Sequence, residues 1–225
     1  GRSTVPRVIR RLGFSRKRTY ARAPETERIM ELRQDFCGRV RHHNSTTIVS
    51  VDETCLYFDM PKRSGYAKKG KRLHVPLHRR RSDKYTLLLA VSNTQVVGYR
   101  LLQGSADAAT FADFVSSLSL QCHHSHLLMD NVAFHKSKVV TQALAVKGLK
   151  PLFTPPYSPE YNPVEMAFSV FKAHMRCVQP GTNISGSQNM LTDLLGRVAY
   201  CAGTLTSAKL AAMFRHVWDL TRYNP

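Results

Sequence analysis

Three acidic residues stand at positions where their carboxylates could do chemistry. Asp52 directly follows the apolar segment TTIVSV, and Asp130 directly follows HLLM, so each is expected at the end of a buried strand. Glu165 follows Asn162 and Pro163 at the expected start of a helix. Singly, each acid has a simpler explanation, namely a strand end in solvent for the aspartates and a capping box with Asn162 as N-cap for Glu165. Together they form a set that phosphodiester chemistry requires.

Two-metal catalysis explains why such a set would be needed. A pair of ions stabilises both the attacking and the leaving oxygen of an in-line displacement. Mg²⁺ is held by few carboxylates and keeps water and phosphate oxygens as its other ligands. Asp52, Asp130 and Glu165 are therefore predicted to be both the catalytic residues and the ligands of two Mg²⁺ ions, for which Mn²⁺ is expected to substitute.

The elements that must position these acids alternate between strands and helices. Apolar or β-branched runs predict strands at 46–52, 55–58, 85–91, 126–130 and 149–153. A helix is expected over ADAATFADFVSSL, with Ser105 as N-cap and Asp107 near the positive end of the helix dipole. Further helices are expected at about 136–146 and from NPVE onward. The order βββαβαβα is an α/β layer, and it matches the ribonuclease H-like fold, a mixed sheet flanked by helices.

The segments on either side of this core are expected to be helical. Residues 3–12 place apolar side chains on one helical face and arginines elsewhere, as in the last helix of a helix-turn-helix, and a second helix of mixed charge is expected at about 24–40. The tail from residue 182 is expected to be a loop and one or two helices, in which Trp218 packs. The predicted division is 1–45, the tail of a DNA-binding region and a linker; 46–178, the catalytic domain; and 179–225, a helical extension.

The charge of the chain indicates a polyanionic partner. The formal net charge is +18, and it is concentrated in residues 1–45, with 12 basic and 4 acidic residues, and in 61–84, with 10 basic and 1 acidic. Such blocks predict phosphate contacts with nucleic acid rather than a merely solvated surface. The predicted DNA-contacting residues are Arg7, Arg10, Arg11, Arg16, Lys17, Arg18, Lys68, Lys69, Lys71, Arg72, Arg79, Arg80 and Arg81.

Three motifs make the functional prediction specific. VDETCLYF, LLMDNVAFH and PPYSPEYNPVEMAFSVFK resemble the motifs of the mariner superfamily of DDE transposases, which includes bacterial insertion-sequence relatives. The third motif is the most diagnostic because it matches the pattern YSP-x-x-NP-x-E. The second and third acids are separated by 34 residues, as in a common class of that superfamily. The resemblance covers about residues 46–175, and STVPRVIRRLGFSRKR is similar to the end of the family's paired-type DNA-binding region.

The resemblance implies cut-and-paste DNA transposition. Water would first hydrolyse the phosphodiester at the transposon end, and the freed 3′-hydroxyl would then attack target DNA, commonly at TA. Asp52 would bridge the two ions, and residues 61–84 would touch DNA or the second subunit of a homodimer assembled on DNA. The partners would be double-stranded transposon ends and target DNA. The protein would act in the nucleus of a eukaryotic host, or in the cytoplasm or nucleoid of a bacterial one.

Two residues match the family's DN-x-x-x-H pattern and are expected beside the scissile phosphate. These are Asn131 and His135, for which a helix-capping asparagine and a structural histidine are the alternative interpretations. Glu53 is expected to point to the opposite side of its strand from Asp52. The family's DNA-binding region normally has two helix-turn-helix units, whereas this sequence begins inside the last, and Phe168 stands where many relatives carry tryptophan.

Two other functions are compatible with parts of this pattern. A domesticated DNA-binding or regulatory protein could keep the fold without transposition, but the intact acidic triad argues against it. Another ribonuclease H-like nuclease could use the same acids, but the YSP-x-x-NP-x-E motif argues against that.

The remaining features predict an intracellular protein without zinc or a membrane partner. No apolar run of 18 residues and no signal peptide occurs. The five cysteines are irregularly spaced and are expected to be reduced thiols. The ligands in CHHSH (122–126) are too close together on one segment to reach one tetrahedral ion, even with His42 and His43 nearby.

Overall fold

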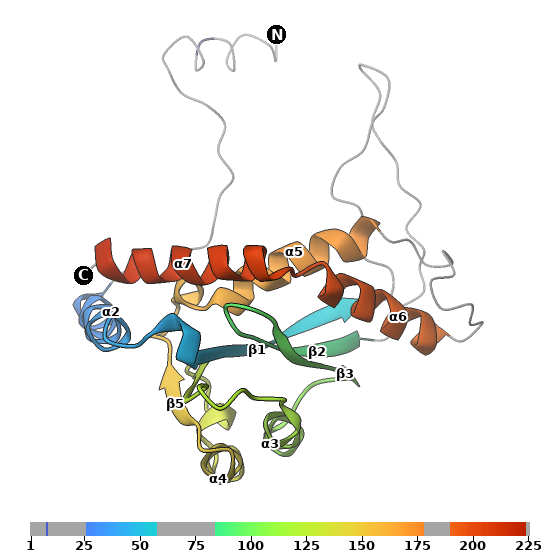
Figure 1. The fold of residues 1–225 in the computed structure, drawn as a ribbon, viewed down its shortest axis with the longest axis horizontal. Helices are drawn as coiled ribbons and strands as arrows, with labels where there is room; N and C mark the ends of the chain where they lie inside the picture. The colour runs from blue at the N-terminus through green and yellow to red at the C-terminus, as the bar shows by residue number, and fades with distance from the viewer. Residues whose placement is uncertain (1–7, 9–25, 58–83, 178–189, 224–225) are drawn as a thin grey trace.

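A computed structural model of the chain describes Val8 and residues 26–57, 84–177 and 190–223. Five strands form one sheet: β1 (Ile48–Tyr57), β2 (Lys84–Val91), β3 (Val96–Gln103), β4 (His126–Met129) and β5 (Lys150–Phe153). The α-helices are α2 (Glu27–Val40), α3 (Ala108–Ser117), α4 (Lys138–Val146), α5 (Pro163–Cys177), α6 (Met190–Gly203) and α7 (Ser207–Tyr223). Short 3-10 helices are η1 (Ser45–Thr47), η2 (Phe134–Lys136) and η3 (Pro159–Tyr161). Figure 1 shows their arrangement.

The sheet is mixed, with the strand order β3-β2-β1-β4-β5. β1, β2 and β3 are antiparallel neighbours, whereas β4 and β5 run parallel to β1. In the parallel pair, Ser50 lies beside Leu128. Two residues further along, the same register brings positions 52 and 130 to neighbouring places, so the two predicted aspartates come from adjacent strands.

Two strand predictions were wrong. The two segments predicted at 46–52 and 55–58 correspond to the single strand β1, because β1 pairs with β2 without a break from Ser50 to Tyr57. Residues 46 and 47 lie in η1 instead, and residue 58 is outside the described residues. The third strand of the antiparallel part is β3, which had not been predicted. Its sequence, VVGYRLLQ, contains a glycine and an arginine and is only partly buried at the edge of the sheet, so it lacks a clear apolar pattern.

The start of α3 also differs from the prediction. Asp107, not Ser105, is its N-cap, since the carboxylate of Asp107 accepts hydrogen bonds from the backbone N–H and the hydroxyl of Thr110 at 2.8 and 2.6 Å. The other helices expected within the described residues are confirmed, with α4 beginning two residues later than predicted, after η2.

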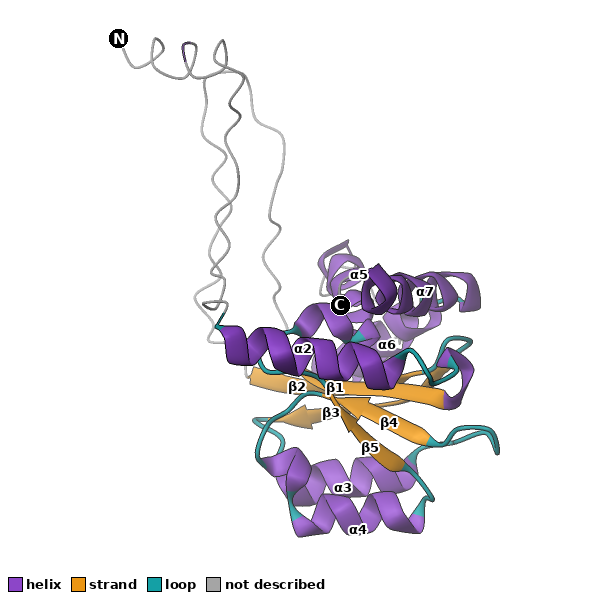
Figure 2. Cartoon of the chain, turned by 90° about the vertical axis from the view of Figure 1, so that its left-hand side faces the viewer, coloured by secondary structure: helices purple, strands orange, loops and turns teal. Residues whose placement is uncertain are grey.

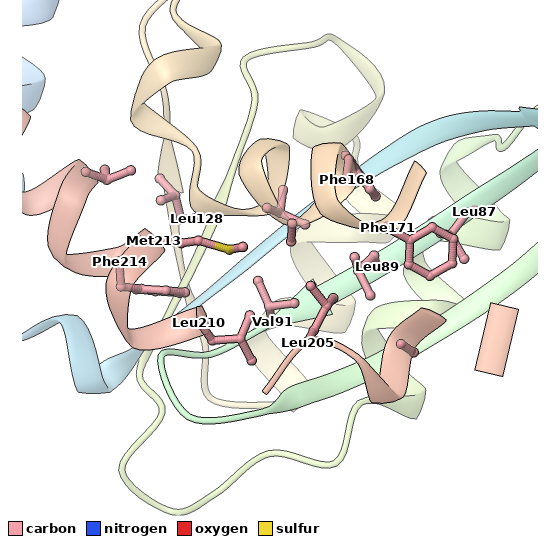
Figure 3. Packing of buried hydrophobic residues seen from close by; sticks show 14 of the residues in the cluster. Leu87, Leu89, Val91, Leu128, Phe168, Phe171, Leu205, Leu210, Met213 and Phe214 are labelled. Carbon is pink, nitrogen blue, oxygen red and sulfur yellow. The ribbon is translucent and has the colours of Figure 1, made fainter. Parts of the chain in front are cut away.

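Helices cover both faces of the sheet, and each face has its own apolar core. α3 and α4 pack against one face, and α2, α5, α6 and α7 against the other (Figure 2). On the second face, alternate residues of β2 meet α5 and the α6–α7 region (Figure 3). This alternation follows from the two-residue period of a strand. The same period places Ser50, Asp52 and Thr54 of β1 on the α5 face.

The helices before and after the sheet share its core. Phe36 of α2, Leu194 of α6 and Phe214 of α7 belong to one buried cluster with β1 and β2. Trp218 stacks on Phe214, as expected of a packing residue, and its Nε1 donates to the carbonyl of His43 at 3.1 Å. The division of the chain at residues 45 and 178 stays a prediction.

Two further findings complete the description. All five cysteines are free. None of the helices in the described part of the chain is long and apolar enough to span a membrane.

Candidate active site

The three predicted acids line one pocket of about 440 Å³. They come from three elements, because Asp52 lies within β1, Asp130 directly follows β4, and Glu165 is the third residue of α5. The sequence predicted Asp52 at the end of a strand. In the structure it lies in the middle of β1. The other lining residues are Asn131, Val132, Thr154, Pro155, Pro156, Tyr157, Ser158, Pro159 and Asn162.

A buried hydrogen-bond network joins β1 to the start of α5. The hydroxyl of Ser50 donates to Asn162 Oδ1 at 2.5 Å and accepts from the backbone N–H of Val164 at 3.1 Å. Asn162 Nδ2 donates to Asp52 Oδ2 at 3.1 Å. The other oxygen of Asp52 accepts from the backbone N–H of Glu53 at 2.8 Å. Both oxygens of the Asp52 carboxylate are thus held in a defined orientation.

This network overturns the capping-box interpretation of Asn162 and Glu165. The side chain of Asn162 bonds to two residues of β1 instead of to its own helix. Ser50 satisfies the second N–H of α5, a group that a helix leaves without an intrahelical partner. Local sequence could not show this, because the partners are more than 100 positions apart.

The carboxylate of Glu165 is available for a ligand. Within the described residues, its side chain makes no hydrogen bond or ion pair. The residue is exposed overall and lines the pocket. Partial burial raises the pKa of Glu165, the charge of Lys172 acts to lower it, and the charges of Asp130 and Glu53 raise it further. Glu165 therefore faces other acids across the pocket.

Asp52 experiences this crowding of negative charge most strongly. Only 7% of the residue is exposed, and burial, followed by the charges of Asp130 and Glu53, raises its pKa to about 8. The charge of Glu165 adds to the same effect. A bound cation would compensate this repulsion, and the oxygen donors suit a hard ion such as Mg²⁺. No three His, Cys, Asp or Glu side chains in the described part of the chain are grouped as ligands of a single ion. Mg²⁺ takes few carboxylates and fills its shell with water and phosphate oxygens.

His135 supports Asp130 from outside the pocket. It is fully buried, and its Nδ1 lies 2.7 Å from Asp130 Oδ1 while its Nε2 lies 3.4 Å from Glu53 Oε2. Burial acts to lower the pKa of His135, but the hydrogen bonds and charges of the two carboxylates outweigh it and raise the pKa to about 9. The side chain of Glu53 contacts His135 and does not line the pocket, consistent with its expected direction.

The two members of the DN-x-x-x-H pattern thus have different positions. Asn131 lines the pocket and is exposed, so a role beside the scissile phosphate stays a prediction. His135 is not among the lining residues but contacts Asp130, so its role at the site stays a prediction as well. The predicted DNA-contacting residues in 7–18 and 68–81 lie outside the described residues, as does the helix expected at 3–12 apart from Val8.

Sequence reasoning missed the role of Ser50. The only available signal was a small polar residue within the apolar run IVSV, two positions before Asp52 and on the same face of the strand.

The mixed sheet and the acidic pocket define an α/β enzyme core with a site suited to phosphodiester chemistry. Residues 47–183 match the family described as DDE superfamily endonuclease, and the chain belongs to that family. No curated protein matches the sequence.

Solved structures with the same fold come from the Mos1 mariner transposase. The Mos1 paired-end complex with the left transposon end is similar with a TM-score of 0.77 and 20% identity, over 98% of this chain and 68% of that chain. The Mos1 paired end complex with Mn gives 0.77 and 20% over 100% and 70%. The isolated Mos1 catalytic domain gives 0.65 and 17% over 91% and 96%. The predicted ribonuclease H-like fold is confirmed.

Proposed function

We propose that this chain is a cut-and-paste DNA transposase whose catalytic residues are Asp52, Asp130 and Glu165. The observation that carries the proposal is the convergence of these three acids, from β1, β4 and α5, on one pocket. The family match supports DNA endonuclease chemistry. The finer reaction, cleavage at a transposon end followed by joining to target DNA at TA, is supported by the similarity in fold to Mos1, whose structures include a Strand Transfer Complex.

The three acids would hold two Mg²⁺ or Mn²⁺ ions, and Mos1 paired end complexes have been solved with each metal. Bound divalent ions would supply charge stabilisation for the attacking and leaving oxygens. The protein's own groups orient this set, because Asn162 and the Glu53 amide fix the two oxygens of Asp52 and His135 holds Asp130. Such supporting contacts align ligands before substrate arrives.

The DNA would be bound largely outside the described residues. The basic segments 1–45 and 61–84 carry most of the net positive charge. Their arginines and lysines at 7–18 and 68–81 are proposed to contact phosphates of transposon ends and target. A homodimer on DNA would bring two ends together, as the paired-end complexes of Mos1 suggest. Action in the nucleus of a eukaryotic host, or the cytoplasm or nucleoid of a bacterial one, belongs to the same proposal.

A cleavage and joining assay tests this function. The full chain is incubated with Mg²⁺ or Mn²⁺, a labelled duplex carrying the terminal repeats that flank its gene, and a plasmid target. In wild type, we expect metal-dependent cleavage that frees a 3′ end of the labelled duplex, followed by joining of that end to the plasmid. Asp52→Asn should yield neither the cleaved duplex nor the joined product. The matched control is Asp107→Asn, an acid of α3 outside the pocket. DNA binding without cleavage would instead indicate a domesticated binding protein, and cleavage without joining another type of nuclease.

A further inference from the structure

The loop between β5 and α5 forms much of the wall of the pocket. Residues 154–162, which we term the rim loop, supply seven of the twelve lining residues and lead directly into Glu165. The rim loop also carries Asn162, which bonds to Asp52. Its only regular structure is the three-residue η3, so its shape depends on contacts from other parts of the chain.

Arg33 of α2 makes several of these contacts. Its Nε donates to Ser158 Oγ at 2.9 Å, and its Nη2 donates to the carbonyl of Tyr157 at 3.2 Å and lies 3.2 Å from Glu160 Oε1. The Ser158 hydroxyl in turn donates to the carbonyl of Pro156 at 3.0 Å. The guanidinium therefore links consecutive residues of the rim loop with the planar, multidentate geometry that arginine offers.

The backbone at Tyr157 shows why such a clamp is needed. Its φ of 53° lies in the left-handed region, which residues with side chains adopt only when surrounding contacts hold them there. Tyr157 lines the pocket and is 72% exposed as a residue, so its own packing does not fix this conformation. The bond from Arg33 to the Tyr157 carbonyl is placed to do so.

We propose that Arg33 is a positioning residue for catalysis. This role of Arg33 rests on the proposed function. It holds the rim loop so that Asn162 reaches Asp52 and Glu165 enters the pocket. Phe36, one turn further along α2, reinforces the contact through its ring, 5.5 Å from that of Tyr161. α2 lies outside residues 47–183, the span that matches the family, and on the same side of the sheet as α5 (Figure 2). The catalytic unit thus includes α2.

Arg33→Lys tests the proposal because lysine keeps the positive charge near Glu160 but lacks the fork of donors. In the full chain with Mg²⁺, the expected result is a fall in kcat for end cleavage of roughly a hundredfold, as for slightly misplaced catalytic groups. DNA binding and KM should stay within about twofold of wild type, because lysine keeps the positive charge and the contacts of Arg33 with Ser158 and Tyr157 orient the rim loop. The matched control is Arg39→Lys on the same helix, where Arg39 pairs with exposed Asp35 at 3.0 Å. Unchanged kcat in Arg33→Lys would overturn the proposal.

Ser158→Ala removes the acceptor of Arg33 Nε without altering α2, and it decides the question if Arg33→Lys fails to fold. Its kcat should also fall, and the double variant should be little worse than either single one, because both break the same contact. Independent, multiplying losses in the two variants would contradict a shared clamp.

Hydrogen exchange separates this proposal from the transposase assignment. The amides of Tyr161 and Asn162 donate to the carbonyls of Ser158 and Pro159 at 3.2 and 3.0 Å within the rim loop. They should exchange faster in Arg33→Lys than in wild type, and at the wild-type rate in Arg39→Lys. Wild-type exchange in Arg33→Lys would overturn the clamp even if the enzyme cleaves DNA. Lack of cleavage by wild type would contradict the proposed function while leaving the exchange result decisive for Arg33.

Discussion

The N-termini of α3 and α5 differ in how their first backbone N–H groups are hydrogen-bonded. Each helix leaves its first backbone N–H groups without intrahelical partners. At α3, Asp107 caps its own helix by bonding to Thr110 three residues away. At α5, the residue in the corresponding position, Asn162, turns its side chain to β1, and Ser50 of that strand takes the N–H of Val164.

The difference shows that capping by neighbouring residues is replaced by long-range bonds where the start of a helix forms part of the candidate active site. α3 is capped by its own sequence, so its start needs only neighbouring residues. α5 is joined to the sheet by buried long-range bonds, and Glu165, which a capping box would use locally, has no hydrogen bond or ion pair within the described residues. The start of α5 is therefore both a structural joint and part of the candidate active site.

The largest expected effect is that of Glu165→Gln. If Glu165 is a metal ligand, the neutral amide lacks the charge that Mg²⁺ requires, and cleavage should fall by orders of magnitude. Because the carboxylate makes no hydrogen bond within the described residues, the melting temperature should stay within a few degrees of wild type. Cleavage rates and thermal melts of the same preparation check this. Near-wild-type cleavage would remove Glu165 from the proposed triad.

A smaller effect on activity, with a larger one on stability, is expected for Ser50→Ala. The change leaves the buried Val164 N–H and Asn162 Oδ1 without their partner, which should cost about 1–3 kcal/mol of unfolding free energy. Cleavage should fall by about tenfold to a hundredfold, because Asn162 then holds Asp52 less firmly. Urea unfolding and cleavage assays measure the two losses.

The control for Ser50→Ala is Ser116→Ala, in which the lost hydroxyl donates to the Ala112 carbonyl within α3 and to no other group of the described residues. It should change cleavage little. Equal losses of cleavage in the two serine variants would show that the joint between β1 and α5 has no special role.

Asp107→Ala should affect stability alone. Removing the cap of α3 should lower the melting temperature by about 2–4 °C, since a cap contributes modestly to a chain of this size. Cleavage should be unchanged, because Asp107 does not line the pocket. A loss of cleavage as large as that of Ser50→Ala would contradict the conclusion that only the start of α5 contributes to the candidate active site.

The smallest effect is a pH dependence of the α3 cap. Hydrogen bonds from the Thr110 side chain and then its backbone lower the pKa of Asp107 below its ordinary value. A depressed folded-state pKa adds stability above the unfolded pKa, and this stability is lost as pH falls through the folded value. Wild type and Asp107→Asn should therefore converge in stability toward acid pH. Divergence as the pH falls would contradict the assigned cap.

The sequence predicted the three acids because they stand beside apolar runs and within motifs of specific spacing. It also predicted most helices, since their apolar faces follow a helical period. It did not predict β3, whose edge position requires little apolar alternation, or the bonds among Ser50, Asn162 and Asp52, which depend on which strand meets which helix. Arg33 was missed for the same reason, because its partners lie more than 120 residues away.

Anomalous diffraction from crystals soaked in Mn²⁺ shows whether the acidic pocket binds metal. We expect anomalous peaks at the carboxylates of Asp52, Asp130 and Glu165 in wild type, with the peaks weakened or lost in Asp52→Asn. Peaks that avoid these carboxylates, or a pocket without a peak at saturating Mn²⁺, would contradict this expectation.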